Sequence, residues 1–138
     1  MALPPKPFAG AAACCLAALL AAGCGSDGLK TVPVRGTITY RGNPVSHGTV
    51  MFQPASGPAA IGDIRDGRYV LLTDRFPGAV VGRHKVTVIA LQDQSDRLPE
   101  HRNPLPPPVV PLRYSFPDRS GLTAQVNHAA NEINFDLK

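Results

Sequence analysis

The fold is decided by the stretch VRGTITYRGNPVSHGTVMFQP, residues Val34 to Pro54. In its first part, apolar or small residues at every second position alternate with polar ones. One face takes Val34, Gly36, Ile38 and Tyr40, preceded by Val32, and the other takes Arg35, Thr37, Thr39 and Arg41. A period of two is typical of a strand that buries one face. The next three residues, Gly-Asn-Pro at 42–44, predict a turn, and Val50 and Phe52 then begin a second alternation.

More strands of this kind follow along the chain. The segment DIRDGRYVLLT, residues 63–73, contains Asp66-Gly67, a strong hairpin signal between two short apolar runs. In that segment Tyr69, Leu71 and Thr73 oppose Val70 and Leu72, which predicts a strand covered on both faces. Further strands are predicted in HKVTVIAL (84–91), LTAQV (122–126) and NEINFDLK (131–138).

Composition agrees with this pattern, since fifteen prolines and thirteen glycines among 138 residues favour short strands joined by turns. We count about seven strands and no amphipathic helix, so the sequence predicts an all-β, antiparallel sandwich.

One segment interrupts the strand pattern. Residues 93–111, DQSDRLPEHRNPLPPPVVP, carry too many prolines for a central strand and predict a loop with polyproline-type extension. A mobile, solvated loop is the favoured interpretation. The alternative is a docking site for a partner, with Leu105, Val109 and Val110 as its contact points.

The first residues predict a secretory signal, residues 1–23, expected to form a signal helix. Phe8 to Gly23 is a run of apolar or small residues. That run is shorter than the ~20 residues that a bilayer-spanning helix needs, and it fits the apolar core of a cleaved signal. An uncleaved membrane anchor is the weaker alternative.

The end of this run, LAAGC, resembles a bacterial lipobox. The resemblance implies that Gly23 is the last residue removed and that Cys24 becomes a lipid-modified N-terminus. The chain departs from the usual pattern at Ala21, where leucine is preferred. A cleaved signal with a chance cysteine is the alternative.

Lipid modification would make residues 24–31 a short tether, of which the six residues after Cys24 span roughly 13 Å when flexible. More than one acyl chain gives stable anchoring. Cys14 and Cys15 would leave with the signal, so the mature chain could form no internal disulfide. The expected location is the cell envelope, on the periplasmic or outer side, without a choice between inner and outer membrane.

Several segments together resemble carboxypeptidase regulatory-like domains. They are VRGTITYRGNPVSHGTVMFQP, DIRDGRYVL, PGAVVGRHKVTV and the ending YSFPDRSGLTAQVNHAANEINFDLK. The resemblance covers residues 32–138 apart from the proline-rich loop. It implies a seven-stranded antiparallel Greek-key sandwich of the transthyretin (prealbumin) type. Members of this family mostly lack an assigned activity, so the fold supplies no function.

The sequence predicts no catalytic residues, cofactor or metal. His47, His84, His101 and His128 show no metal-ligand spacing and are expected on the surface. No Gly-x-Ser-x-Gly elbow or phosphate-binding loop occurs, and Asp63 and Asp66 flank a hairpin. Transthyretin-like hydroxyisourate hydrolases end in Tyr-Arg-Gly-Ser, whereas this chain ends in FDLK.

We therefore expect a non-catalytic, lipid-anchored envelope protein that makes structural or protein–protein contacts. Its partners would be the membrane and other envelope proteins. The net charge of +4 comes from scattered basic residues, which argues against nucleic acid. The alternative is a small carbohydrate- or peptide-binding module, with Tyr114 and Phe116 as its exposed aromatics. Tyr40, Tyr69, Phe52 and Phe135 are expected in the core.

Overall fold

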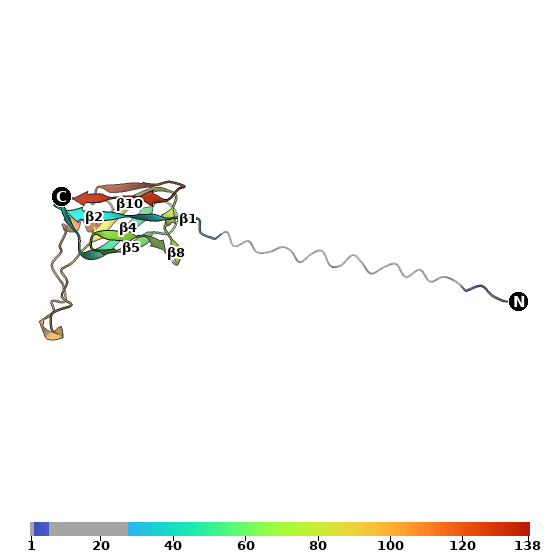
Figure 1. Cartoon of the computed structure of the whole chain (residues 1–138), viewed down its shortest axis with the longest axis horizontal. Helices are drawn as coiled ribbons and strands as arrows, with labels where there is room; N and C mark the ends of the chain where they lie inside the picture. The colour runs from blue at the N-terminus through green and yellow to red at the C-terminus, as the bar shows by residue number, and fades with distance from the viewer. Residues whose placement is uncertain (1, 6–27) are drawn as a thin grey trace.

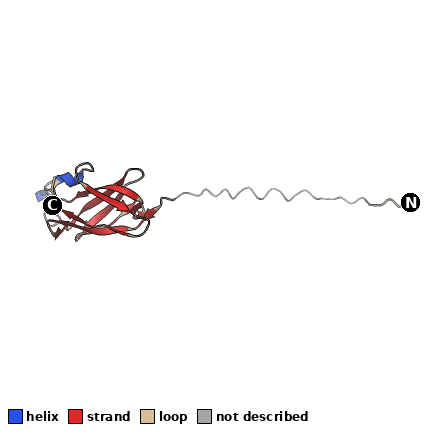
Figure 2. Cartoon of the chain, turned by 90° about the horizontal axis from the view of Figure 1, so that it is seen from above, coloured by secondary structure: helices blue, strands red, loops and turns tan. Residues whose placement is uncertain are grey.

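A computed structural model of the chain describes residues 2–5 and 28–138. Of the predicted signal helix, residues 1–23, only residues 2–5 are described, and they are not helical; its remaining residues and Cys24 lie outside the described residues. Within the described part the protein is all-β, as predicted, with two short 3-10 helices and no α-helix (Figure 2). None of its described helices has the length and apolar character needed to cross a membrane.

Most of the strands are short. They are β1 (Thr31–Val32), β2 (Val34–Tyr40), β3 (Asn43–Pro44), β4 (His47–Pro54), β5 (Ala60–Arg65), β6 (Arg68–Val70), β7 (Leu72–Thr73), β8 (Phe76–Pro77), β9 (Ala79–Val80), β10 (Gly82–Ile89), β11 (Leu122–Val126), β12 (Asn131–Glu132) and β13 (Phe135–Leu137). The 3-10 helices are η1 (Pro99–His101) and η2 (Leu112–Ser115).

The strands form a strongly curled sheet in the order β11-β10-β4-β5-β6-β2-β12, and β13 also pairs with β2 (Figure 1). Neighbours are antiparallel except β12 and β13, which run parallel to β2. A separate two-stranded ladder joins β1 to β9, where the chain enters the domain. The C-terminal residues thus return to the first long strand and close one side of the curl.

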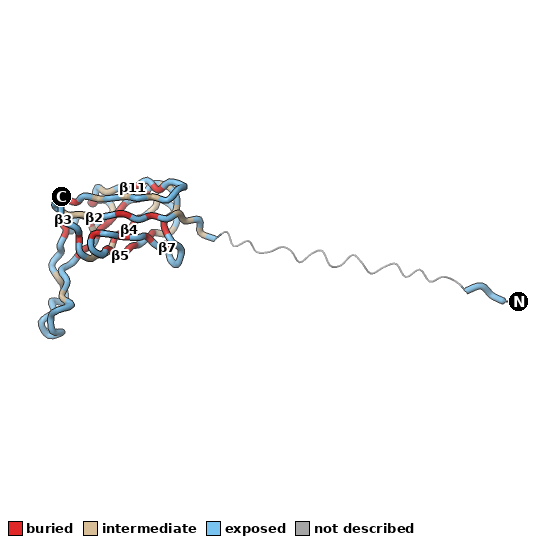
Figure 3. The backbone as a smooth tube through the Cα atoms, viewed as in Figure 1, coloured by how far each residue is buried: buried red, intermediate tan, exposed pale blue. Residues whose placement is uncertain are grey.

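The core lies inside the curl (Figure 3). Along β2, Val34 and Ile38 are buried while Arg35 and Thr37 are exposed, so the predicted alternation is confirmed. Phe52 on β4 sits at the centre, with its ring about 6 Å from those of Tyr69 and Phe135. Phe52 and Tyr69 are buried as expected, and Tyr40 and Phe135 are partly buried.

His84 was expected on the surface, and that prediction is wrong. Strand β10 alternates so that His84 shares the inward face with Val86, and its side chain is fully buried. The ring packs against Phe52 at 5.8 Å, and its Nε2 lies 2.8 Å from the carbonyl oxygen of Val80. The other three histidines are exposed or half-buried, as expected.

Two tight turns set the register of the neighbouring strands. Asp66 and Gly67 both have positive φ, 50° and 77°, which confirms the predicted hairpin between β5 and β6. The first turn lies one residue earlier than expected, at Arg41-Gly42, with φ of 52° and 80°. Asn43 and Pro44 pair back with β2 instead of forming the turn.

Gly36 governs the return of the C-terminal residues to β2. A Cβ at this position would lie 1.7 Å from the carbonyl oxygen of Ile133. That oxygen accepts a hydrogen bond of 2.6 Å from the Tyr69 hydroxyl. Burial raises the pKa of this hydroxyl, which therefore stays protonated and able to donate.

We predict that Gly36→Ala lowers the free energy of unfolding by about 2–4 kcal/mol, because the methyl group collides with backbone. Gln125→Ala, at an exposed position of β11, should change it by less than about 0.5 kcal/mol. Urea denaturation of both variants measures the difference. Equal stability of the two variants would contradict the close approach at Gly36.

Candidate functional site

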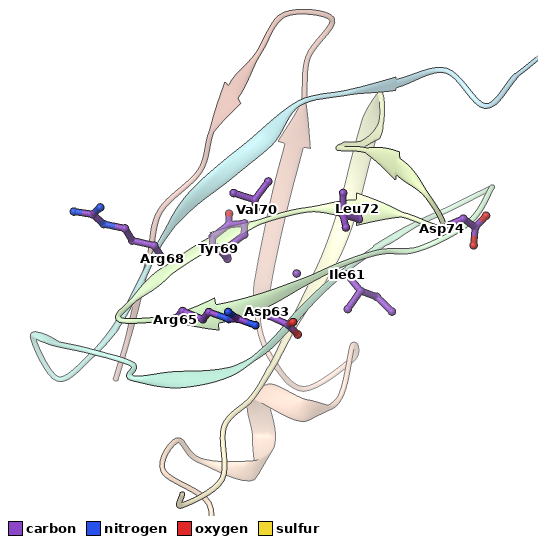
Figure 4. Close-up of a pocket in the computed structure, with 9 residues that line it drawn as sticks. Ile61, Asp63, Arg65, Arg68, Tyr69, Val70, Leu72 and Asp74 are labelled. Atoms are coloured by element: carbon purple, nitrogen blue, oxygen red, sulfur yellow. The ribbon is translucent and has the colours of Figure 1, made fainter. Parts of the chain in front are cut away.

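The outward side of the sheet carries an exposed apolar group, which we call the outer apolar face: Ile61, Val70 and Leu72 (Figure 4). Ile61 on β5 lies directly opposite Leu72 on β7 in the sheet register. The three side chains are 49%, 62% and 48% exposed. The sequence predicted a strand covered on both faces, but no described part of the chain covers this one.

Charged side chains surround the outer apolar face. Asp63 and Arg65 lie along β5, Arg68 begins β6, and Asp74 follows β7 (Figure 4). The surface is open, and the described residues contain no cluster of three or more histidine, cysteine or acidic groups that could hold a metal. An exposed apolar patch with a charged rim is typical of a surface that contacts another macromolecule.

We predict that Ile61→Thr and Leu72→Thr change the free energy of unfolding by less than about 1 kcal/mol, because both side chains are half-exposed and threonine suits a strand. Ile64→Thr should lower it by about 2–4 kcal/mol, since Ile64 is buried on the same strand. Urea denaturation compares them. A large loss from the outer variants would mean that these side chains serve the core.

The proline-rich segment, residues 93–111, forms a projecting arm at the end of the molecule that holds the C-terminus (Figure 1). We call it the proline-rich arm. At its base the Gln92 amide donates to the Pro107 carbonyl at 2.9 Å, and the Val109 amide donates to the Ala90 carbonyl at 2.8 Å. The arm therefore leaves and returns as two hydrogen-bonded stretches.

Side chains brace the outer half of the arm. The side chain of Gln94 donates to the Asn103 carbonyl at 3.0 Å and accepts from the Asn103 amide at 2.6 Å. The Arg102 guanidinium donates to the carbonyls of Arg97 and Ser95. Hydrogen bonds from the backbone and hydroxyl of Ser95 lower the pKa of the Asp93 carboxyl. These contacts hold the arm without burying it.

The predicted contact residues of the arm differ in exposure. Leu105 is 82% exposed and Val109 is 36% exposed. Val110, by contrast, is only 3% exposed, because the chain turns into the core at the base of the arm just before η2. Val110 therefore packs in the core at the base of the arm, and the prediction that it is an exposed contact residue is wrong.

Tyr114 was expected to be exposed, and this is also wrong, since it is buried on η2. Its hydroxyl accepts from the Lys138 amide at 3.0 Å and donates to a Lys138 oxygen at 3.0 Å. The Arg113 guanidinium also donates to this hydroxyl. Tyr114 thus fastens the C-terminus to the base of the arm. Phe116, just beyond η2, is half-exposed as expected.

We predict that Tyr114→Phe lowers the free energy of unfolding by about 1–2 kcal/mol, because three hydrogen-bonding groups lose their shared partner. Tyr40→Phe is the matched control: among the described residues the Tyr40 hydroxyl makes no hydrogen bond, so its loss should cost less than about 0.5 kcal/mol. Thermal unfolding of both variants makes the test. A harmless Tyr114→Phe would remove the proposed fastening role.

The outer apolar face was missed by sequence reasoning, although its signal was present. Val70 and Leu72 stand at positions where a half-exposed strand would carry polar side chains. Comparison with protein-family models, with curated proteins and with solved structures finds no match to this chain. The candidate surfaces therefore rest on the geometry of this molecule.

Proposed function

We propose that the chain is a non-catalytic, lipid-anchored protein of the cell envelope that makes structural or protein–protein contacts. In this proposal residues 1–23 are a signal peptide, cleavage follows Gly23, and Cys24 carries the acyl chains. Residues 24–31 are the tether, and residues 32–138 are the domain, held on the periplasmic or outer side of a membrane.

The observation that carries the proposal is the position of the chain's entry relative to the proline-rich arm. Residues 28–30 lead into β1 at one end of the domain, and the arm projects from the opposite end (Figure 1). A tether that reaches roughly 13 Å would keep the β1 end close to the membrane. The arm would then be the part of the domain farthest from the bilayer, where it can meet another envelope protein.

The outer apolar face supports the same function. Its three half-exposed side chains, Ile61, Val70 and Leu72, lie within a charged rim and outside the buried core cluster. Apolar side chains at the outward positions of β6 and β7, Val70 and Leu72, are expected when something outside the chain contacts them.

At the finer level we propose the Greek-key sandwich of the transthyretin type. The spatial order β10-β4-β5-β6, with β10 returning beside β4, is the order of a Greek key. Strands β5 and β6 pair through Arg65 and Arg68, which lie opposite each other. Such a short pairing allows the sheet to bend sharply between these two strands. Phe52 meets Phe135 across the interior, as expected for two facing walls.

The alternative, a carbohydrate- or peptide-binding module, loses support because Tyr114 is buried. Phe116 remains, with the Arg119 guanidinium 5.4 Å from its ring centroid. Phe76 is exposed to a similar degree but belongs to a different element, β8, so each ring by itself is a small platform for a sugar and contact with another protein is the better interpretation.

The test is the intact mass of the mature protein recovered from membranes. We expect the mass of residues 24–138 plus acyl chains, and we expect Cys24→Ser to be unmodified and released from the membrane. Cys15→Ser is the matched control, because Cys15 would leave with the signal and the mature mass should not change. An unmodified, soluble wild-type chain would overturn the anchoring.

A further inference from the structure

We infer that the hairpin formed by β7 and β8, residues 72–77, contacts the lipid bilayer beside the acyl anchor and places the Phe76 ring at the level of the lipid headgroups. We call this segment the entry hairpin. The inference rests on the proposed function, because it names the surface that meets the membrane once Cys24 is acylated. The hairpin's position beside β1, its exposed ring and its charge lead to this inference.

The entry hairpin is fixed beside the strand at which the chain enters the domain (Figure 1). The Thr31 hydroxyl on β1 donates to the Pro77 carbonyl oxygen at 2.7 Å. Strand β1 also pairs with β9, which follows the hairpin. Between these two contacts lies Gly78, where a Cβ would be 1.8 Å from the Val32 carbonyl oxygen. The hairpin therefore keeps its place next to β1 unless these contacts break.

The proposed tether brings this hairpin to the membrane. Only residues 25–30 separate Cys24 from Thr31, the first residue of β1. Six flexible residues span roughly 13 Å. Since Thr31 is hydrogen-bonded to Pro77, the neighbouring Phe76 is held near the start of β1. The Phe76 ring is thus within reach of the headgroup region, where the apolar side chains of peripheral proteins insert.

Exposed apolar side chains flank β1 at this end of the domain (Figure 3). Phe76 is 46% exposed and lies outside both the core cluster and the residues that pack against that cluster. Val81, directly after β9, is also exposed. Contact with a bilayer would remove both side chains from water, which is favourable for apolar surface.

The charges at this end suit a membrane that contains anionic lipid. Arg75 at the tip of the hairpin and Arg83 near the start of β10 are exposed, and neither forms an ion pair with another described residue. Basic side chains near the surface are attracted to lipid phosphates. Asp74 has a φ of 54°, which aspartate tolerates in turns, so the turn accounts for this acid. The acid on β12, Glu132, lies 3.9 Å from Arg35 and is balanced by it.

The experiment uses the fact that the chain has no tryptophan. Phe76→Trp gives the full-length protein a single tryptophan, and Phe116→Trp is the matched control. Phe116 is 49% exposed, nearly as much as Phe76, but lies beside η2 at the end that holds the C-terminus (Figure 2). Each protein is purified from membranes and reconstituted in vesicles of phosphatidylcholine and phosphatidylglycerol. The acyl chains of these lipids carry bromine, which quenches tryptophan fluorescence on contact.

We expect the brominated lipids to quench the tryptophan at position 76 about threefold more strongly than the one at position 116. Arg75→Glu should lower the quenching at position 76 by about half in these vesicles, and not in vesicles of phosphatidylcholine alone. Arg65→Glu, at an exposed position at the far end of β5, is the control and should leave it unchanged. Every variant should unfold within a few degrees of the wild type, because all four positions are exposed.

The inference is overturned if the two positions are quenched equally or if position 116 is quenched more strongly. It is also overturned if the tryptophan at position 76 is shielded from both brominated lipid and aqueous iodide, since a second copy of the chain would then cover it.

The mass of the mature chain in the same sample separates these failures from failure of the proposed function. A chain that carries acyl chains but shows no preferential quenching at position 76 keeps the anchoring and refutes the hairpin contact. A chain without acyl chains refutes the anchoring. Its Cys24 thiol is then coupled to a maleimide-bearing lipid, and the same comparison of positions 76 and 116 decides the hairpin contact.

Discussion

The structure depends on the close approach of the C-terminal residues to β2 at Gly36. Residues 131–137 run parallel to β2, and the Ile133 carbonyl lies where any side chain at position 36 would be. The Tyr69 hydroxyl, from the neighbouring strand β6, donates to that carbonyl and ties three segments together. A sheet that curls has a free edge until something returns to it. Here the last residues of the chain do so, and they bring Phe135 into ring contact with Phe52 at the centre of the core.

Closing the curl in this way determines which side chains face the core and which face solvent. Inward positions of β2, β4, β5, β6 and β10 form the core, so the half-exposed apolar side chains at outward positions, Ile61, Val70 and Leu72, lie outside it. The C-terminal residues also fix the base of the proline-rich arm. The Tyr114 hydroxyl on η2 binds Lys138, and Val110, which lies just before η2, is buried. The proline-rich arm, whose residues 93–109 are exposed or half-buried, is therefore attached where Arg113 and Tyr114 bind Lys138.

Whether a residue in a regular strand is buried could be predicted from the sequence, because successive side chains point to only two faces of the sheet. The alternation around Ile38 and the Asp66-Gly67 turn were predictable for this reason, whereas the pairing of the C-terminal residues with β2 was not predicted. His84, Val110 and Tyr114 were not predictable. His84 follows the period of its strand, but a polar ring suggested the surface, and only the packing against Phe52 and the bond to Val80 explain its burial. Val110 and Tyr114 lie where the chain leaves the arm through a 3-10 turn, which has no sequence period long enough to indicate a buried side.

The arm and the outer apolar face differ in the way they would bind. The face offers three aliphatic side chains in a shallow, charged surround, so its contacts would depend on the area and shape of whatever covers it. The arm is a narrow projection: backbone hydrogen bonds join its base to residues 90–92, and the Gln94 side chain bonds to Asn103 across its outer half. The arm also leaves the domain at the end opposite the chain's entry, so contacts made through it would lie far from β1, whereas the outer apolar face lies along the side of the sheet (Figure 1).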